Sequence, residues 1–178
     1  LFLVGGSLAG ALLAFWNLMR WRTVRLEVCP QGIRYRRQNV SDEFRWLDVD
    51  TIQASITDHS VNGVYAGRHY HVHVKLVDGR RFQLHNSIDE LGTVLERLQR
   101  ECLTHLLANA RDFGPISLTA TGLKTNKRTL DWNEVGRWRL ADGFFYISDR
   151  AGKQFLRLAY GKIPNAFVLL RLLKHHVP

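Results

Sequence analysis

The chain begins with nineteen residues that contain no charged side chain, LFLVGGSLAGALLAFWNLM. As a helix this run would be about 28 Å long, close to the thickness of a bilayer's hydrocarbon core. Arg20, Trp21 and Arg22 follow directly; basic residues beside a span stay on the cytoplasmic side, and tryptophan favours the headgroup layer. We therefore expect residues 1–22 to form a transmembrane helix and juxtamembrane segment in the cell membrane, with everything after Arg20 in the cytoplasm.

Two other interpretations of this apolar run remain open. A cleaved signal peptide would have a shorter apolar region, preceded by basic residues and followed by small ones. A helix buried in a protein core would also be apolar on all sides. About 155 residues follow the run, enough for one ordinary domain or two small ones.

The chain also contains an internal repeat. Its first copy consists of Leu26 and Val28, then Gly32-Ile33, then Trp46-Leu47-Asp48-Val49. Its second copy consists of Ile116 and Leu118, then Gly122-Leu123, then Trp132-Asn133-Glu134-Val135. Self-similarity of this kind predicts a duplicated structural unit, in which Trp46 and Trp132 are equivalent buried residues.

Each copy has the pattern of several short strands followed by one helix. Alternating apolar residues and glycine-containing turns predict the strands. Ser87 and Glu90 form a capping box before an amphipathic helix, whose apolar stripe would cover an open sheet. Pro164 begins the final helix, and residues 58–67, which are polar and contain glycine, are expected to form a loop.

This organisation resembles an uncharacterised bacterial membrane-anchored family with tandem pleckstrin-homology-like (PH-like) domains. The resemblance also rests on Phe44-Arg45, Asp78-Gly79 and the run Lys162-Ile163-Pro164-Asn165. It implies an α+β fold in which a transmembrane helix precedes two PH-like units, at residues 23–113 and, in a shorter form, 114–178. Each unit would be an antiparallel sheet or partly open barrel capped by a C-terminal helix. The resemblance implies recognition of headgroups or protein segments and carries over no catalytic residue.

Basic residues gather behind the apolar run, and they are the candidates for binding anionic lipid headgroups: Arg22, Arg25, Arg34, Arg36 and Arg37. Arg34 and Arg36 alternate with Ile33 and Tyr35, so we expect these two arginines to face outward. Anionic lipid attracts each well-placed basic residue with about 1 kcal/mol, and salt weakens this attraction. The alternative is that the cluster reflects membrane topology alone.

Three histidines, His69, His71 and His73, share one face of a predicted strand. Histidines at this spacing do bind zinc, but no carboxylate or cysteine stands at a fixed spacing to complete a ligand set. The alternative is an exposed polar strand face, and we expect no metal or cofactor. The sequence has no phosphate-binding glycine loop, no paired-carboxylate motif and no serine nucleophile motif.

The net charge of +9 makes nucleic acid a possible class of partner. The aromatic residues occupy core-facing positions of the predicted strands rather than an exposed stacking platform, so we expect no nucleic-acid partner. The sequence therefore predicts a membrane-anchored cytoplasmic binding or scaffold protein, not an enzyme, that engages anionic lipid headgroups or a protein partner. The alternative is a hydrolase or metal-dependent enzyme whose site has no sequence motif.

Overall fold

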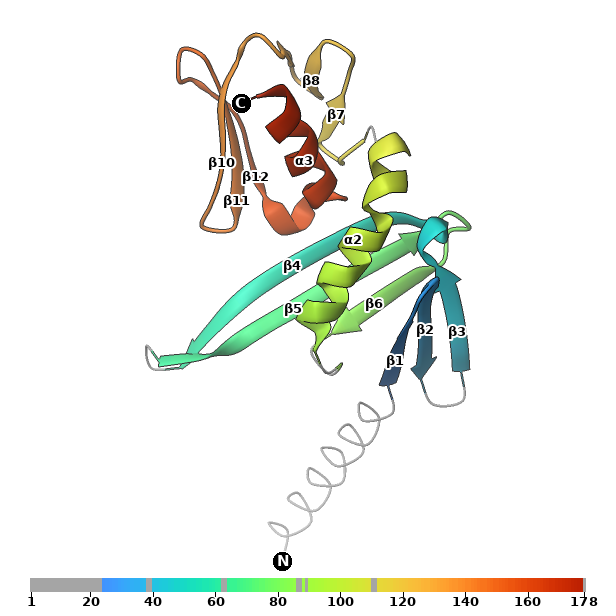
Figure 1. The fold of residues 1–178 in the computed structure, drawn as a ribbon. Coiled ribbons are helices and arrows are strands. Elements are labelled where there is room, and N and C mark those ends of the chain that lie inside the picture. Colours follow the sequence, from blue (N-terminus) through green and yellow to red (C-terminus); the bar gives the residue numbers. More distant parts are fainter. Residues whose placement is uncertain are drawn as a thin grey trace, which may run out of the picture.

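The computed structural model describes residues 24–37, 40–61, 64–85, 88, 90–109 and 112–177. The first half (residues 24–109) contains two antiparallel three-stranded sheets and a helix (Figure 1). The first sheet consists of β1 (Val24–Cys29), β2 (Gly32–Arg37) and β3 (Val40–Arg45). The second consists of β4 (Val49–Val61), β5 (Val64–Leu76) and β6 (Arg81–His85), and is followed by α2 (Leu91–Asn109).

The second half (residues 112–177) repeats this order of two three-stranded sheets and one helix on a smaller scale. Its first sheet consists of β7 (Ile116–Leu118), β8 (Gly122–Thr125) and β9 (Thr129–Asp131). Its second consists of β10 (Val135–Ala141), β11 (Phe144–Asp149) and β12 (Gln154–Ala159), and is followed by α3 (Ala166–His176). Short 3-10 turns precede β4 and α3, at Trp46–Asp48 and Tyr160–Lys162.

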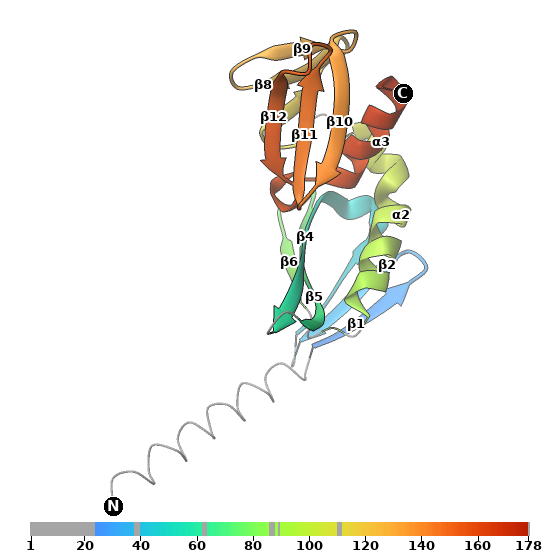
Figure 2. The same ribbon diagram turned by 90° about the vertical axis from the view of Figure 1, so that its left-hand side faces the viewer.

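The helices cover the sheets through their apolar stripes. The buried side chains of α2 recur at helical spacing: Leu91, Leu95, Leu98, Cys102 and Leu106. This stripe contacts β4 and β5, whose core-facing residues alternate with exposed polar ones. In the second half, α3 lies against one face of the β10–β12 sheet, as Figure 1 and the turned view of Figure 2 both show.

The two copies of the repeat form the same local structure. A Cβ atom added at Gly32 would lie 2.0 Å from the carbonyl oxygen of Phe44, and one added at Gly122 would lie 2.2 Å from that of Leu130. Both glycines therefore permit a close approach between neighbouring strands that no other residue would allow.

The tryptophans of the repeat differ in burial although their backbone contacts agree. The N–H of Trp46 donates to the carbonyl of Gln31 at 3.0 Å, and that of Trp132 donates to Thr121 at 2.9 Å. The ring of Trp46 is buried, whereas the ring of Trp132 is only half-buried and stacks on His176 with 4.3 Å between ring centroids. The prediction of two buried tryptophans is thus right for Trp46 and wrong for Trp132, because the second copy has a smaller core.

The expected α+β class is wrong for the described residues, which form a mainly β structure with two helices. Within this part of the chain, strands pair only inside their own three-stranded sheet, so each half contains two separate antiparallel sheets instead of the one antiparallel sheet or partly open barrel that we expected. The physical reason is the 3-10 turn at Trp46–Asp48, which takes the chain out of the first ladder before β4 begins. The turn after β9 does the same in the second half.

The membrane segment expected at residues 1–22 lies outside the described residues. Among the helices that the structure does describe, none combines the length and the apolar character needed to cross a bilayer. The nineteen residues of α2 include Glu96, Arg97 and Arg100, and α3 has only eleven residues. The transmembrane protein expected from the sequence is therefore not supported by any described helix.

Residues 58–67 were expected to form a loop, and this expectation is also wrong. Residues 58–61 and 64–67 belong to β4 and β5, which pair from Val49↔Leu76 to Val61↔Val64 and form a long hairpin that extends beyond the rest of the sheet (Figure 1). Residues 62 and 63 lie outside the described residues. Polar residues suit these positions because this end of the hairpin is exposed on both faces.

Candidate functional site

The arginine cluster predicted from the sequence is only partly available for binding. Arg34 and Arg36 are exposed on the face of β2 opposite Ile33, and Arg25 lies across from Arg36. Arg34 is already paired, since it lies 3.3 Å from Glu27 and 3.5 Å from Glu43 on the neighbouring strands. Of the remaining candidates, Arg22 lies outside the described residues, and Arg37 is described only as the last residue of β2.

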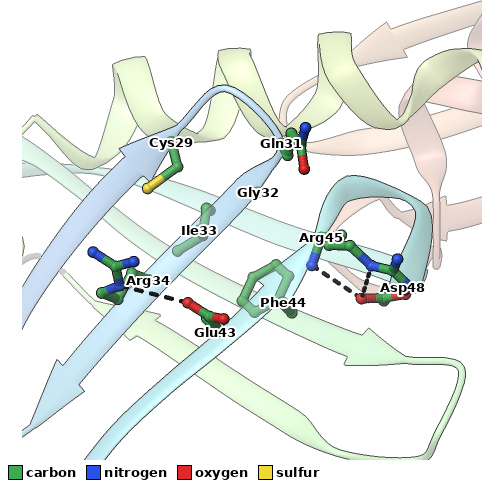
Figure 3. A pocket seen from close by; sticks show the side chains of 9 residues that line it. All are labelled: Cys29, Gln31, Gly32, Ile33, Arg34, Glu43, Phe44, Arg45 and Asp48. Atoms are coloured by element: carbon green, nitrogen blue, oxygen red, sulfur yellow. Dashed lines mark hydrogen bonds and ion pairs between the residues drawn. The ribbon is translucent and has the colours of Figure 1, made fainter.

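A hollow of about 340 Å³ opens beside this cluster (Figure 3). Its charged side chains are Arg34, Glu43, Arg45 and Asp48, and Figure 3 shows them joined in two pairs, Arg34 with Glu43 and Arg45 with Asp48. Arg45 donates to Asp48 at 2.9 Å, and Arg34 lies 3.5 Å from Glu43. Because each cation here already faces a carboxylate, the hollow offers no free charge to a ligand.

The pKa values at this hollow agree with charges that are already compensated. The pKa of Asp48 is lowered, first by the side-chain hydrogen bonds of Arg45 and then by the backbone N–H of Arg45. The pKa of Arg34 is raised, first by the Cys29 sulfur and then by Glu27 and Glu43. Neither shift prepares an acid or base for catalysis near neutral pH.

The three histidines predicted as weak metal candidates do lie on one exposed face of β5, but they do not converge on a common point. Within the described residues, no group of three or more histidine, cysteine, aspartate or glutamate side chains is arranged to hold a metal ion. His71 instead lies opposite His85 on β6, with 3.4 Å between their Nδ1 atoms, and His69 lies beside His59 on β4. The cross-strand partners His59 and His85 were not identified from the sequence.

The most distinctive surface lies in the second half, on the face of the β10–β12 sheet turned away from α3. Tyr146 stands in the central strand β11, directly opposite Arg139 of β10 and Arg157 of β12. The guanidinium carbon of Arg139 lies 4.6 Å from the centroid of the Tyr146 ring. That of Arg157 lies 4.2 Å from the Phe144 centroid and 5.8 Å from that of Tyr146. We call these four residues, with Arg137 at the edge, the arginine–aromatic face.

This face is strongly basic because nothing on it balances the arginines. Among the described residues, every ion pair joins two residues of the first half. Residues 114–178 contain eleven lysines and arginines but only four aspartates and glutamates, so they carry seven of the nine net positive charges. The excess charge of the chain is therefore concentrated in its second half, away from the cluster that the sequence indicated.

The sequence did not indicate this face because Phe144, Phe145 and Tyr146 are consecutive aromatic residues. A strand turns alternate side chains to opposite faces, and three successive aromatic residues give no indication of which one faces outward. In the structure Phe145 is buried, whereas Phe144 and Tyr146 are half-buried beneath the arginines. The only local signal was Arg137-Trp138-Arg139, where two arginines alternate with an aromatic residue.

Comparison with known proteins adds a family without a described activity. One family model matches the chain over residues 1–177, and its description is "Family of unknown function (DUF6585)". No curated protein matches the chain.

Proposed function

We propose that this chain, which belongs to the DUF6585 family of unknown function, is a non-catalytic binding module for anionic lipid headgroups. The observation that carries the proposal is the pair of arginines, Arg139 and Arg157, stacked over aromatic rings on an exposed face with no carboxylate partner among the described residues. The resemblance to bacterial proteins with PH-like repeats supports the class of function, a binding module, and the division into units at residues 23–113 and 114–178.

The stacking geometry favours phosphate as the recognised group. A guanidinium held over a ring still presents N–H groups, and these match the oxygen atoms of a phosphate or carboxylate. The rings of Phe144 and Tyr146 are already covered by Arg157 and Arg139, so they offer little free surface for stacking a nucleic-acid base. This arrangement therefore favours an anionic surface over a single-stranded nucleic acid.

The surroundings of the face favour a lipid surface as the source of that phosphate. The strands β10–β12 form an open sheet face, and Tyr146 is of a residue type that favours the headgroup layer of membranes. The net positive charge of residues 114–178 adds a long-range attraction to anionic lipid. We place this contact at the cytoplasmic leaflet of the cell membrane, where acidic lipids are concentrated.

The test is co-sedimentation of the full chain with vesicles of phosphatidylcholine alone or mixed with phosphatidylserine. The measured quantity is the ratio of the affinity for acidic vesicles to the affinity for neutral vesicles, because contacts that do not depend on charge cancel in this ratio. The double variant R139Q/R157Q should reduce the ratio about 30-fold, because each arginine contributes about 1 kcal/mol of binding free energy. Added salt should weaken the binding of the parent chain to acidic vesicles.

The matched control is the double variant R25Q/R36Q, which removes two exposed arginines of the β1–β3 sheet that stack on no ring. R25Q/R36Q should reduce the ratio of the two affinities by a smaller factor than R139Q/R157Q does. If R25Q/R36Q has the larger effect, the original arginine cluster is the lipid site and the arginine–aromatic face is not. If the parent chain does not distinguish acidic from neutral vesicles but binds an acidic peptide, the partner is a protein and the lipid proposal is wrong.

A further inference from the structure

The outer face of the β4–β6 sheet is rich in histidine. Five of the eight histidines of the chain stand in these three strands, at odd-numbered positions that point away from the core: His59, His69, His71, His73 and His85. They are exposed or half-buried, and the opposite face of the same strands carries core residues such as Val72 and Leu84. Imidazole nitrogens on an accessible face are the common protein ligands of zinc and copper.

One pair of these histidines is held at a distance that suits a metal ion, and we infer that His71 and His85 bind a divalent transition metal of tetrahedral preference, such as Zn²⁺. Their Nδ1 atoms are 3.4 Å apart. Two Zn–N bonds of about 2.0–2.1 Å that meet at a tetrahedral angle separate their nitrogens by about 3.3–3.4 Å. One ion can therefore bond to both Nδ1 atoms with little movement of either ring.

The same distance fits the competing arrangements less well. In the structure the two ring nitrogens form a hydrogen bond, and its length of 3.4 Å exceeds the usual range of about 2.7–3.2 Å. Two neighbouring ligands of a square-planar ion, with bonds of about 2 Å, would lie only about 2.8 Å apart. The separation thus suits a tetrahedral ion better than a square-planar one, and the ion would displace only a long hydrogen bond.

The backbone holds this pair in place. His71 and His85 are directly opposed in the antiparallel pairing of β5 and β6, and their rings meet edge to face, with centroids 5.5 Å apart. The register cannot slip by one residue, because that would move Val72 and Leu84 from the core to the solvent. The two imidazoles are therefore brought together by the fold rather than by chance side-chain motion.

The environment leaves room for the other ligands of the ion. His71 lines a hollow of about 470 Å³, together with Ser55 and Gln53. Within the described residues no third metal-ligating side chain converges on the pair, so the remaining positions of a tetrahedral ion would be filled by water. We therefore expect an exchangeable site with open positions rather than a closed structural zinc site.

The test is a titration of the full chain with Zn²⁺, followed by calorimetry, and with Co²⁺, whose absorption spectrum distinguishes tetrahedral from octahedral coordination. The variants H71A and H85A should each weaken Zn²⁺ binding about tenfold or more, because each removes half of the protein ligands. The matched control is H73A, which removes a histidine from the same face of the same strand, where the cross-strand partner is Gln83. H73A should leave the affinity within about twofold of the parent chain.

Two further measurements distinguish a specific metal site from nonspecific binding of metal ions by exposed histidines. The affinity of the parent chain should be lower in acidic than in neutral solution, because protons compete with the metal for the imidazole nitrogens. All three histidines are on the surface of the sheet, so circular dichroism should show that the three variants remain folded. The inference is wrong if H73A weakens binding as much as H71A and H85A do, if neither H71A nor H85A changes the affinity, or if bound Co²⁺ is octahedral.

Discussion

The amide side chain of Asn165, at the start of α3, completes the backbone pairing of Ile52 in β4. The N–H of Ile52 donates to the Oδ1 atom of Asn165 at 2.8 Å, and the N–H of Asn165 donates back to the carbonyl of Ile52 at 2.8 Å. The Asn165 amide nitrogen also donates to the carbonyl of Asp50 at 3.1 Å. Asn165 thus takes the place of a strand neighbour for β4 and joins the two halves of the protein.

Replacing Asn165 should destabilise the whole chain. Asn165 is 3% exposed and has a positive φ of 51°, a conformation that asparagine tolerates better than most residues. N165A would leave the N–H of Ile52 buried without an acceptor, so it should lower the free energy of unfolding by about 2–4 kcal/mol, measured by urea denaturation. The control N133A changes an exposed asparagine and should have little effect. Equal stability of N165A and the parent chain would contradict the role of Asn165 as the joint.

The two glycines of the repeat should respond alike to substitution. In G32A and G122A the new methyl group would lie 2.0–2.2 Å from a carbonyl oxygen of the neighbouring strand, so the strands must move apart. We expect each variant to lose about 2 kcal/mol or more of unfolding free energy, as overpacked positions do. Q31A, at the exposed residue before Gly32, serves as the control for urea denaturation. If only one glycine variant is destabilised, the two copies are not structurally equivalent.

Asp48 should make stability depend on pH in the acid range. Its pKa is lowered in the folded state by Arg45, so the folded protein binds a proton at Asp48 less readily than the unfolded chain. The resulting stabilisation is complete above the ordinary aspartate pKa of about 3.9 and is lost as the pH falls through the lower, folded-state pKa. D48N should therefore be less stable than the parent chain at neutral pH, and the difference should shrink below about pH 4. A difference that stays constant in thermal melts down to pH 2 would exclude this linkage.

The two cysteines should react at very different rates. Burial raises the pKa of the Cys102 thiol to about 12, and its side chain is 0% exposed, whereas Cys29 is partly exposed. Since the thiolate is the reactive form, iodoacetamide at pH 8 should label Cys29 and leave Cys102 unmodified until the protein unfolds. Mass spectrometry of the labelled peptides distinguishes the two sites. Rapid labelling of Cys102 in the folded chain would show that α2 opens locally. Both thiols are free in the structure.

Local patterns predicted much of the core correctly. Alternation in β2 correctly predicted that Arg34 and Arg36 face outward, opposite the buried Ile33. The apolar stripe predicted for the helix after Ser87 is the buried face of α2, which includes Cys102 and Leu106. The same reasoning failed for residues 58–61 and 64–67, where polar side chains indicated a loop and the chain instead continues as the paired strands β4 and β5. Backbone hydrogen bonds can form without an apolar face, so polarity alone did not exclude a strand.

The sequence by itself determined the repeated turns, the phase of most strands and the amphipathic face of α2, because these features depend on neighbours within a few residues. Only the tertiary structure decided which charges and rings meet. Glu27 and Glu43 neutralise Arg34, Tyr146 lies between Arg139 and Arg157, and His85 faces His71, in each case across strands. Such contacts depend on the register between strands, and the register is set by packing over the whole sheet, which no single segment encodes.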